Sequence, residues 1–155
     1  MTKQEFERGV LSAQGGLYRV ARSYLRSEQD CLDAVAEAVL KAWQKLPSLR
    51  KEQYFTTWLM RILIRECVNI QRRQKRVTPV ETVPEPEPPA GEAAELAQAL
   101  DALPQTLRTP TVLHYMEGYA VADIAQILHT TTGTVCSQLH RARAALRAVL
   151  KEEDL

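Results

Sequence analysis

The sequence predicts an all-α protein with two small helical domains joined by a linker rich in proline and glutamate. Apolar residues recur three and four positions apart on both sides of residues 77–95, which is the spacing of one face of an α-helix. No stretch bounded by turn signals alternates apolar and polar residues as a half-buried strand does. Residues 77–95 hold five of the eight prolines, and proline cannot continue a helix. We therefore expect domains over 1–76 and 96–155.

Charge is distributed unevenly along the 155 residues, although the formal net charge is only +1. Residues 1–76 carry 15 Lys or Arg against 8 Asp or Glu, whereas residues 77–95 carry five Glu and no cation. Residues 96–155 are near neutral, with five cations and six anions. A basic first domain is typical of proteins that bind a polyanion.

Three apolar stripes predict a helical bundle in the first domain. The first stripe comprises Leu17, Tyr18, Ala21, Tyr24 and Leu25. The second lies on a helix that Pro47 ends and comprises Leu32, Val35, Ala36, Val39, Leu40, Trp43 and Leu46. The third comprises Phe55, Trp58, Leu59, Ile62, Leu63, Cys67 and Ile70.

The third of these helices has a basic side opposite its apolar stripe. The polar residues that share this side are Arg61, Arg65, Asn69, Arg72 and Arg76, with Arg73 beside them. Residues 61–76 hold six cations and one anion, Glu66. This density favours phosphate binding, and a solvated surface is the plainer alternative. Tyr54, just before the helix, is a candidate for contact with a base, whereas Phe55 and Trp58 are expected in the core.

The second domain has the pattern of a helix-turn-helix. Leu96, Leu100 and Leu103 precede Pro104. A short helix is expected with Pro110 in its first turn and Gly118 at its end, and its apolar residues are Val112, Leu113, Tyr115 and Met116. A further helix over 121–128 ends at a break at His129 and Thr130, and Thr131 is placed to cap the helix that follows. The expected buried stripe of that last helix is Val135, Leu139, Ala142, Leu146 and Val149.

Two groups of motifs resemble the sigma factors of bacterial transcription. The run 123–128, Asp-Ile-Ala-Gln-Ile-Leu, and the run 133–143, Gly-Thr-Val-Cys-Ser-Gln-Leu-His-Arg-Ala-Arg, resemble region four of that family. The runs 17–22, 33–43 and 58–62 resemble region two. Because only a short linker separates the two regions, the resemblance is to the extracytoplasmic-function group. It implies a transcription initiation factor that directs RNA polymerase core to promoters and is not an enzyme.

The resemblance also implies roles for individual residues. Binding to the clamp of the largest subunit of RNA polymerase core would involve Asp33, Glu37 and Lys41. The residues expected to hold the minus-ten element of promoter DNA are Tyr54, Arg61, Arg65, Asn69, Arg72, Arg73 and Arg76. The residues expected at the minus-thirty-five element are Thr131, Thr132, Thr134, Cys136, Ser137, Gln138, His140 and Arg141. A membrane-bound anti-sigma factor is the further partner that the resemblance implies.

Three departures from the family pattern affect these expectations. Ala36 stands where the polymerase-binding helix usually has glutamine, which weakens the inference of polymerase binding. His129 occupies a turn position that commonly takes glycine, so a left-handed backbone there would carry strain. Cys136 and Gln138 replace a lysine and an arginine, which predicts weak recognition of the minus-thirty-five element.

The sequence contains no motif typical of a catalytic, metal-binding or cofactor-binding site. The three cysteines are widely spaced without a Cys-x-x-Cys pair, and the three histidines lack partners at ligand-like spacing. No phosphate-binding loop or nucleophile elbow is present, so we expect no cofactor, no metal and no small-molecule substrate. No apolar run reaches the ~18 residues of a membrane span, and the polar start is unlike a signal sequence. We expect a cytoplasmic protein.

Two other functions stay open at this point. A free-standing helix-turn-helix regulator would bind duplex DNA as a dimer, although it would have no use for the 33–43 segment beside a basic helix. A sigma-like interaction module would bind polymerase or an anti-sigma factor without reading a promoter. The near-neutral second domain and its substituted recognition helix favour that second alternative.

Overall fold

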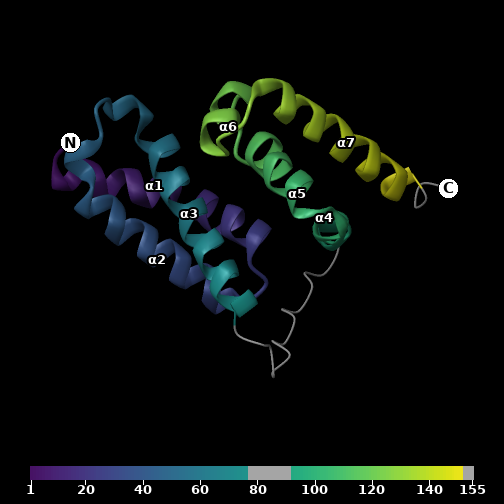
Figure 1. Cartoon of the computed structure of the whole chain (residues 1–155), viewed down its shortest axis with the longest axis horizontal. Helices are drawn as coiled ribbons and strands as arrows, with labels where there is room; N and C mark the ends of the chain where they lie inside the picture. The colour runs from purple at the N-terminus through teal and green to yellow at the C-terminus, as the bar shows by residue number, and fades with distance from the viewer. Residues whose placement is uncertain (77–91, 152–155) are drawn as a thin grey trace. The chain divides into compact units, whose positions relative to one another are not determined.

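The computed structural model describes residues 1–76 and 92–151, and all regular structure in them is helical (Figure 1). The chain divides into two compact units, unit 1 (Met1–Glu85) and unit 2 (Pro86–Leu155). The linker expected over 77–95 lies outside the described residues except at 92–95, which form the first turn of a helix. No helix in the described part of the chain has the length and apolar character to cross a membrane.

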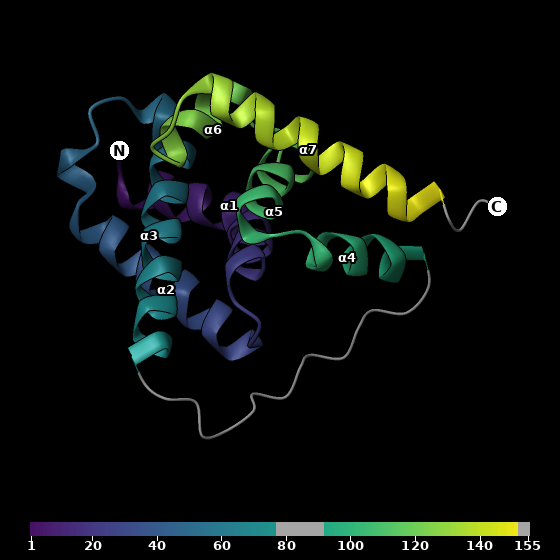
Figure 2. The ribbon, with the colours of Figure 1, turned by 45° about the vertical axis from the view of Figure 1, so that its right-hand side comes forward.

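Unit 1 is a bundle of three long helices, seen in two orientations in Figures 1 and 2. These helices are α1 (Lys3–Tyr24), α2 (Glu28–Gln44) and α3 (Phe55–Arg76). Two single turns, η1 (Leu46–Ser48) and η2 (Glu52–Tyr54), connect α2 to α3. Side-chain caps begin the first two helices, because the hydroxyls of Thr2 and Ser27 accept hydrogen bonds from backbone N–H groups three residues ahead.

Aromatic rings close one end of this bundle. The Phe6 ring centroid is 5.1 Å from that of Trp43 and 5.6 Å from that of Phe55. Gly9 allows α1 to approach this cluster, since a Cβ there would lie 2.5 Å from Cε1 of Phe55. Phe55 is buried as expected, whereas Trp58 is half-buried at the edge of the cluster.

The buried side of α2 differs from the stripe expected from the sequence. Its buried residues are Cys31, Ala34, Ala38 and Ala42. Leu32, Leu40 and Trp43 are 49%, 50% and 43% exposed instead. Small side chains allow α2 to pack closely against α1 and α3, and the larger apolar residues form an uncovered face. The stripe expectation for α2 was therefore wrong, because it ranked residues by hydrophobicity alone.

The third helix agrees better with its predicted stripe. Phe55, Leu59, Leu63 and Cys67 are buried, while Trp58, Ile62 and Ile70 are only partly covered. In α1, Leu17, Ala21 and the following Leu25 are buried, whereas the two tyrosines are half-buried. Apolar periodicity therefore located the buried side of both helices.

The described part of unit 2 contains four helices, one of which is extended by a π-helical turn. The helices are α4 (Glu92–Ala102), α5 (Gln105–Thr111), α6 (Val121–Ile127) and α7 (Thr132–Lys151), and η3 (Val112–Met116) is the π-helical turn. The core of the unit includes Leu100, Leu103, Leu113, Ile124, Ile127, Val135, Leu139 and Ala142.

Pro110 lies inside a helix and not in its first turn. The helix begins at Gln105, with Pro104 before it, and continues without a break from α5 into η3. The π-helical turn ends where the N–H of Glu117 bonds to the carbonyl of Val112, and Gly118 follows with a φ of 75°. A proline removes one backbone donor from a helix, and such local widening is one way of accommodating it. The expected start of this helix was wrong, and its expected end at Gly118 is confirmed.

Four apolar residues of unit 2 are substantially exposed, among them Val149, which was expected in the buried stripe of α7. Their exposed fractions are 42% for Leu96, 52% for Tyr115, 42% for Met116 and 44% for Val149. Val112, Leu113, Val135, Leu139 and Ala142 are buried as expected. The exposed apolar residues gather towards the C-terminal half of α7, where the fold leaves a groove.

Candidate functional site

The outer side of α3 is basic, as its periodicity predicted. Arg65, Arg72, Arg73 and Arg76 are exposed, as is Arg61, and Asn69 is half-buried on the same side. The one acidic residue between positions 61 and 76, Glu66, is turned inwards and is 5% exposed. This separation of charge leaves a surface that can take up several phosphates of a nucleic acid.

Side-chain amides attach the C-terminal half of α3 to the other two helices of unit 1. Nε2 of Gln71 donates a hydrogen bond of 2.8 Å to the backbone carbonyl of Tyr24. Nε2 of Gln74 donates one of 2.7 Å to Oδ2 of Asp30. The basic side of α3 is therefore held on a packed bundle and not on a free helical arm.

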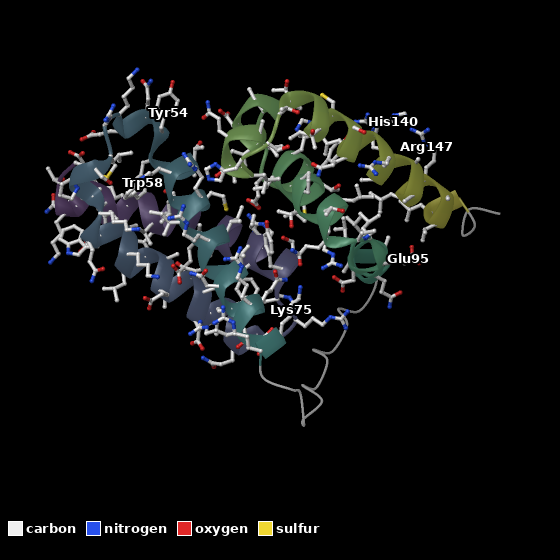
Figure 3. All side chains as sticks on the ribbon, in the orientation of Figure 1. Tyr54, Trp58, Lys75, Glu95, His140 and Arg147 are labelled. Atoms are coloured by element: carbon white, nitrogen blue, oxygen red, sulfur yellow. The ribbon has the colours of Figure 1, made fainter. Side chains whose placement is uncertain are left out.

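Tyr54 lies in η2, directly before α3, and is 48% exposed (Figure 3). Nζ of Lys51 lies 6.0 Å from its ring centroid. An exposed aromatic face beside a cation is suitable for stacking on an unpaired base next to a phosphate. Trp58, one helical turn further on, is half-buried and has less free surface for such a contact.

The three residues expected to bind polymerase lie on α2, in two different environments. Asp33 and Glu37 are exposed, and Asp33 accepts a hydrogen bond of 2.8 Å from Nε2 of Gln29. Lys41 is turned towards α3, where its Nζ donates a hydrogen bond of 2.6 Å to Oε1 of Glu66. Asp33 and Glu37 are thus available to a partner, while the ammonium group of Lys41 is bound within the unit.

A groove of about 670 Å³ separates α2 from the C-terminal half of α3. Its acidic residues on α2 are Asp33 and Glu37, and its basic residues on α3 are Arg72, Arg73 and Arg76. Lys41, Glu66, Asn69 and Ile70 complete the lining. The residues expected to bind polymerase and those expected to bind DNA therefore meet on two sides of one groove.

The helix-turn-helix contains α6, a tight turn and α7. His129 adopts a φ of 54°, so the left-handed backbone expected at this turn is confirmed. The N–H of Thr130 donates a hydrogen bond of 2.9 Å to the carbonyl of Ala125 across the turn. The cap at the start of α7 is also confirmed, because Oγ1 of Thr131 accepts a hydrogen bond of 3.1 Å from the N–H of Thr134.

Most of the residues expected to contact the minus-thirty-five element are exposed on α7 or at its start. The exposed ones are Thr131, Thr132, Thr134, Cys136, Ser137, His140 and Arg141. Figure 3 shows His140 on the outside of this helix, on the same side as Arg147. Gln138 differs, since it is half-buried and its Oε1 is shielded from solvent with no hydrogen-bond partner in the described part of the protein. Its side chain is therefore poorly placed to contact DNA.

The remaining histidine and the buried thiols have structural environments. Nδ1 of His114 lies 2.9 Å from the carbonyl oxygen of Tyr119, a contact that holds the end of η3 against the residues after it. Cys31 and Cys67 are fully buried, and burial raises the pKa of the Cys67 thiol to about 12. No group of three or more potential metal-ligating His, Cys, Asp or Glu side chains occurs among the described residues.

Unit 2 also has an apolar groove that the sequence reasoning missed. It has a volume of about 510 Å³. Its lining residues come from α4, from the α5–η3 helix and from α7, and they are Leu96, Leu100, Thr111, Tyr115, Met116, Arg143, Leu146, Arg147 and Leu150. Nη1 of Arg143 donates a hydrogen bond of 2.7 Å to the hydroxyl of Tyr115 at its edge. The available signal was the number of large apolar residues in this unit outside the buried stripe expected for its last helix.

Two family models match most of the chain. The model of Sigma-70 region 2 matches residues 10–77, and that of Sigma-70 region 4 matches residues 93–146. RNA polymerase sigma factor SigV of Bacillus subtilis is 31% identical over 143 residues, which cover 89% of this chain and 86% of that protein. ECF RNA polymerase sigma factor SigM of Mycobacterium tuberculosis is 35% identical over 142 residues, which cover 86% and 71%.

Two solved structures are also similar. The sigma factor RpoE of Bartonella quintana, solved in complex with the anti-sigma factor NepR, has a TM-score of 0.81 at 25% identity, covering 96% of this chain and 98% of that one. CnrH, solved in complex with the cytosolic domain of CnrY, has a TM-score of 0.75 at 26% identity, covering 97% and 90%.

Proposed function

This chain belongs to the sigma-70 family of transcription initiation factors, in its extracytoplasmic-function group, and we propose that it opens promoters through the surfaces described on α2, α3 and α7. As a sigma factor it is not an enzyme, so its work is done by binding. The observation that carries the proposal is the basic side of α3, which lies on a packed bundle next to the exposed acidic residues of α2.

The polymerase contact is assigned to α2. Its exposed Leu32, Leu40 and Trp43 supply an apolar surface, and Asp33 and Glu37 supply charges beside it. Large apolar side chains left uncovered on a packed helix are typical of a protein-binding surface. We assign this surface to the clamp of RNA polymerase core.

Promoter DNA is assigned to two surfaces. Those arginines of α3 that face outwards would neutralise the backbone of the minus-ten element, and Tyr54 would stack on an exposed base. The N-terminal half of α7 would enter the major groove at the minus-thirty-five element, where Ser137, His140 and Arg141 are exposed. Backbone contacts position such a protein, and base contacts give its specificity.

An anti-sigma factor is the second proposed partner. Of the similar structures described above, RpoE is a sigma factor bound to the anti-sigma factor NepR, and CnrH is bound to the cytosolic domain of CnrY. The apolar groove of unit 2, with arginines at its edge, offers this chain a surface on which such a partner could compete with polymerase. We place the protein in the cytoplasm, where polymerase and promoter are found. Co-expression with the product of the neighbouring open reading frame, followed by competition with core polymerase, tests this partner.

The decisive experiment is run-off transcription with purified core polymerase and templates that carry randomised promoter sequences. We expect transcripts that require the protein and that share sequence elements upstream of their starts. Binding to core without any protein-dependent transcript would instead indicate a sigma-like interaction module. Dimeric binding to duplex DNA in the absence of core would indicate a free-standing regulator.

A further inference from the structure

We propose that Lys41 and Glu66 form a positioning pair that fixes the rotation of α3 against α2 and so determines which side chains α3 presents to promoter DNA. This inference rests on the function proposed for α3. It also replaces the polymerase contact expected for Lys41 with an internal role.

The contact itself is short, and its carboxylate is largely removed from water, while the Lys41 side chain is 35% exposed. Nζ of Lys41 lies 2.6 Å from Oε1 of Glu66, and the Glu66 side chain is 6% exposed. Oε1 of Glu37, on the next turn of α2, is further from the same ammonium group, at 4.0 Å. A carboxylate with so little access to water needs a charged or hydrogen-bonding partner, and Lys41 provides it.

The pair joins residues 25 positions apart on two different helices. The ion pair favours rotations of α3 that keep Glu66 within reach of the Lys41 ammonium group, because a larger rotation would leave the carboxylate without its partner. Apolar contacts between helices are less selective, since several rotations bury similar areas. A single buried polar residue can fix the register of helices in a coiled coil, and we extend this role to the ion pair of Lys41 with Glu66.

The rotation of α3 matters because the residues beside Glu66 face opposite environments. Arg65 is exposed on the basic side, while Cys67 is fully buried. Successive side chains of an α-helix are separated by roughly 100°, so a modest rotation exchanges half-buried for exposed positions. Asn69 and Arg73, one and two turns after Arg65, would move with it.

The location of the pair relates it to both proposed surfaces. Lys41 and Glu66 line the groove whose α2 side carries Asp33 and Glu37 and whose α3 side carries the arginines. A change in the pair would therefore alter how the polymerase-binding helix is oriented against the DNA-binding helix.

The test replaces both members by apolar residues of similar size, Lys41→Met with Glu66→Leu, in the full-length protein. Replacing a whole buried pair in this way is often neutral or stabilising, so we expect a thermal midpoint no lower than that of wild type. Without the ion pair, no charged contact holds α3 at one rotation against α2, so rotations that turn Cys67 towards solvent and Arg65 towards the bundle become accessible. The rotation therefore has a readout that stability alone does not give.

The first readout is alkylation of Cys67 by iodoacetamide, mapped by mass spectrometry. In wild type this thiol is buried and its pKa is raised to about 12, so it should react slowly. We expect the apolar double variant to react on the order of tenfold faster at Cys67. The second readout is open-complex formation with core polymerase at a promoter selected by run-off transcription, which we expect to be lost.

Two matched variants give the test its controls. Asp30→Met with Gln74→Met removes a neutral-to-charged hydrogen bond between the same two helices that is exposed to water and lies near the end of α3. Because water competes for that bond, its loss should leave both readouts at wild-type values. Lys41→Arg keeps a cation opposite Glu66, so we expect wild-type alkylation of Cys67 and wild-type open-complex formation from this variant. If Lys41→Arg lost promoter opening while keeping Cys67 protected, Lys41 would contact polymerase directly and the inference would be wrong.

The remaining outcomes are equally decisive. A stable double variant whose Cys67 stays as slow as in wild type overturns the positioning role, and so does a double variant whose losses merely follow a lower thermal midpoint. The alkylation readout needs neither DNA nor polymerase. If wild type itself fails to open any promoter, the proposed function fails while the alkylation rates still decide the role of the pair.

Discussion

The backbone N–H of Thr134 donates a hydrogen bond of 3.1 Å to Oγ1 of Thr131, and the two hydroxyl oxygens lie 2.9 Å apart. This cap satisfies one of the free N–H groups at the start of α7. It also fixes the residue at which α7 begins, and hence the direction of Cys136, Ser137 and His140. The start of the proposed recognition helix is therefore determined by a side-chain contact within its first turn.

Thr131→Ala should remove this cap and destabilise the start of α7 by about 1 kcal/mol. Thr131→Ser should restore most of the loss, because serine offers the same acceptor. Hydrogen exchange of the amides at 132–139 in the full-length protein measures the effect. Unchanged exchange in the alanine variant would show that contacts with α6 alone determine where α7 begins.

His129 should respond to substitution according to its backbone and not its side-chain chemistry. Its φ of 54° costs an L-residue roughly 1–2 kcal/mol. His129→Gly and His129→Asn should therefore be neutral or stabilising, while the β-branched residue in His129→Val should be destabilising by a similar amount. Chemical denaturation followed by circular dichroism provides the comparison. Equal stability of the valine and glycine variants would contradict it.

The helices that were predicted well are those in which hydrophobicity and burial coincide. In α3, the spacing of Leu59, Leu63 and Cys67 located the buried side and therefore the basic side as well. The turn at His129 and the cap at Thr131 could be predicted because their signals are local. Each depends on residues within a few positions of one another.

The errors occur where a residue's environment depends on a distant part of the chain. In α2, Ala34 and Ala38 are buried because other helices pack closely there, and no local pattern indicates that small residues will be preferred to Leu40. Pro110 lies inside a helix that already begins at Gln105, a start that no apolar periodicity indicates. The ion pair of Lys41 with Glu66 was missed for the same reason, since 25 residues separate its members.

Arg65→Glu with Arg72→Glu should abolish open-complex formation and spare binding to core polymerase. The reason is that both side chains are exposed on the basic side of α3, where a carboxylate would repel phosphate. Permanganate reactivity of thymines near the minus-ten element measures opening. Lys3→Glu with Arg8→Glu on α1 is a matched control, with the same change of charge at exposed positions. Equal loss in both double variants would indicate a general effect of net charge.

Asp33→Lys with Glu37→Lys should release the protein from core polymerase. Both carboxylates are exposed on α2 beside its uncovered apolar residues, and reversing them would oppose a basic partner surface. Oε1 of Glu37 also lies 4.0 Å from Nζ of Lys41, so a lysine at position 37 would repel Lys41. Asp33→Lys with Glu37→Gln avoids that repulsion, and loss of binding in this variant would therefore reflect the contact with polymerase.

Co-purification with core is the measurement for these variants, with helix content checked by circular dichroism. Glu7→Lys with Asp101→Lys, at two exposed positions elsewhere, controls for the change in net charge and should bind core as wild type does. Retained binding by the Asp33 and Glu37 variants would remove these two residues from the polymerase contact.

Cys136 and Gln138 should differ in what they contribute to DNA binding, although both replace cations of the family pattern. Cys136 is exposed on α7, so Cys136→Lys can place an ammonium group near phosphate or a base edge. Gln138 is half-buried with a shielded Oε1. The arginine side chain introduced by Gln138→Arg would therefore have to leave this half-buried position before its guanidinium group could reach DNA. We therefore expect most of the gain from Cys136→Lys.

The measurement is the affinity of the full-length protein for a duplex that carries the selected minus-thirty-five element, across a series of salt concentrations. If the new lysine contacts a phosphate, Cys136→Lys should bind more tightly, with a salt slope steeper by roughly 0.9. If it contacts a guanine, discrimination between sequences should increase by roughly 1–3 kcal/mol. Gln138→Arg should change neither quantity by as much. If Gln138→Arg has the larger effect, α7 presents a different side to DNA. If neither variant has an effect, neither position faces DNA.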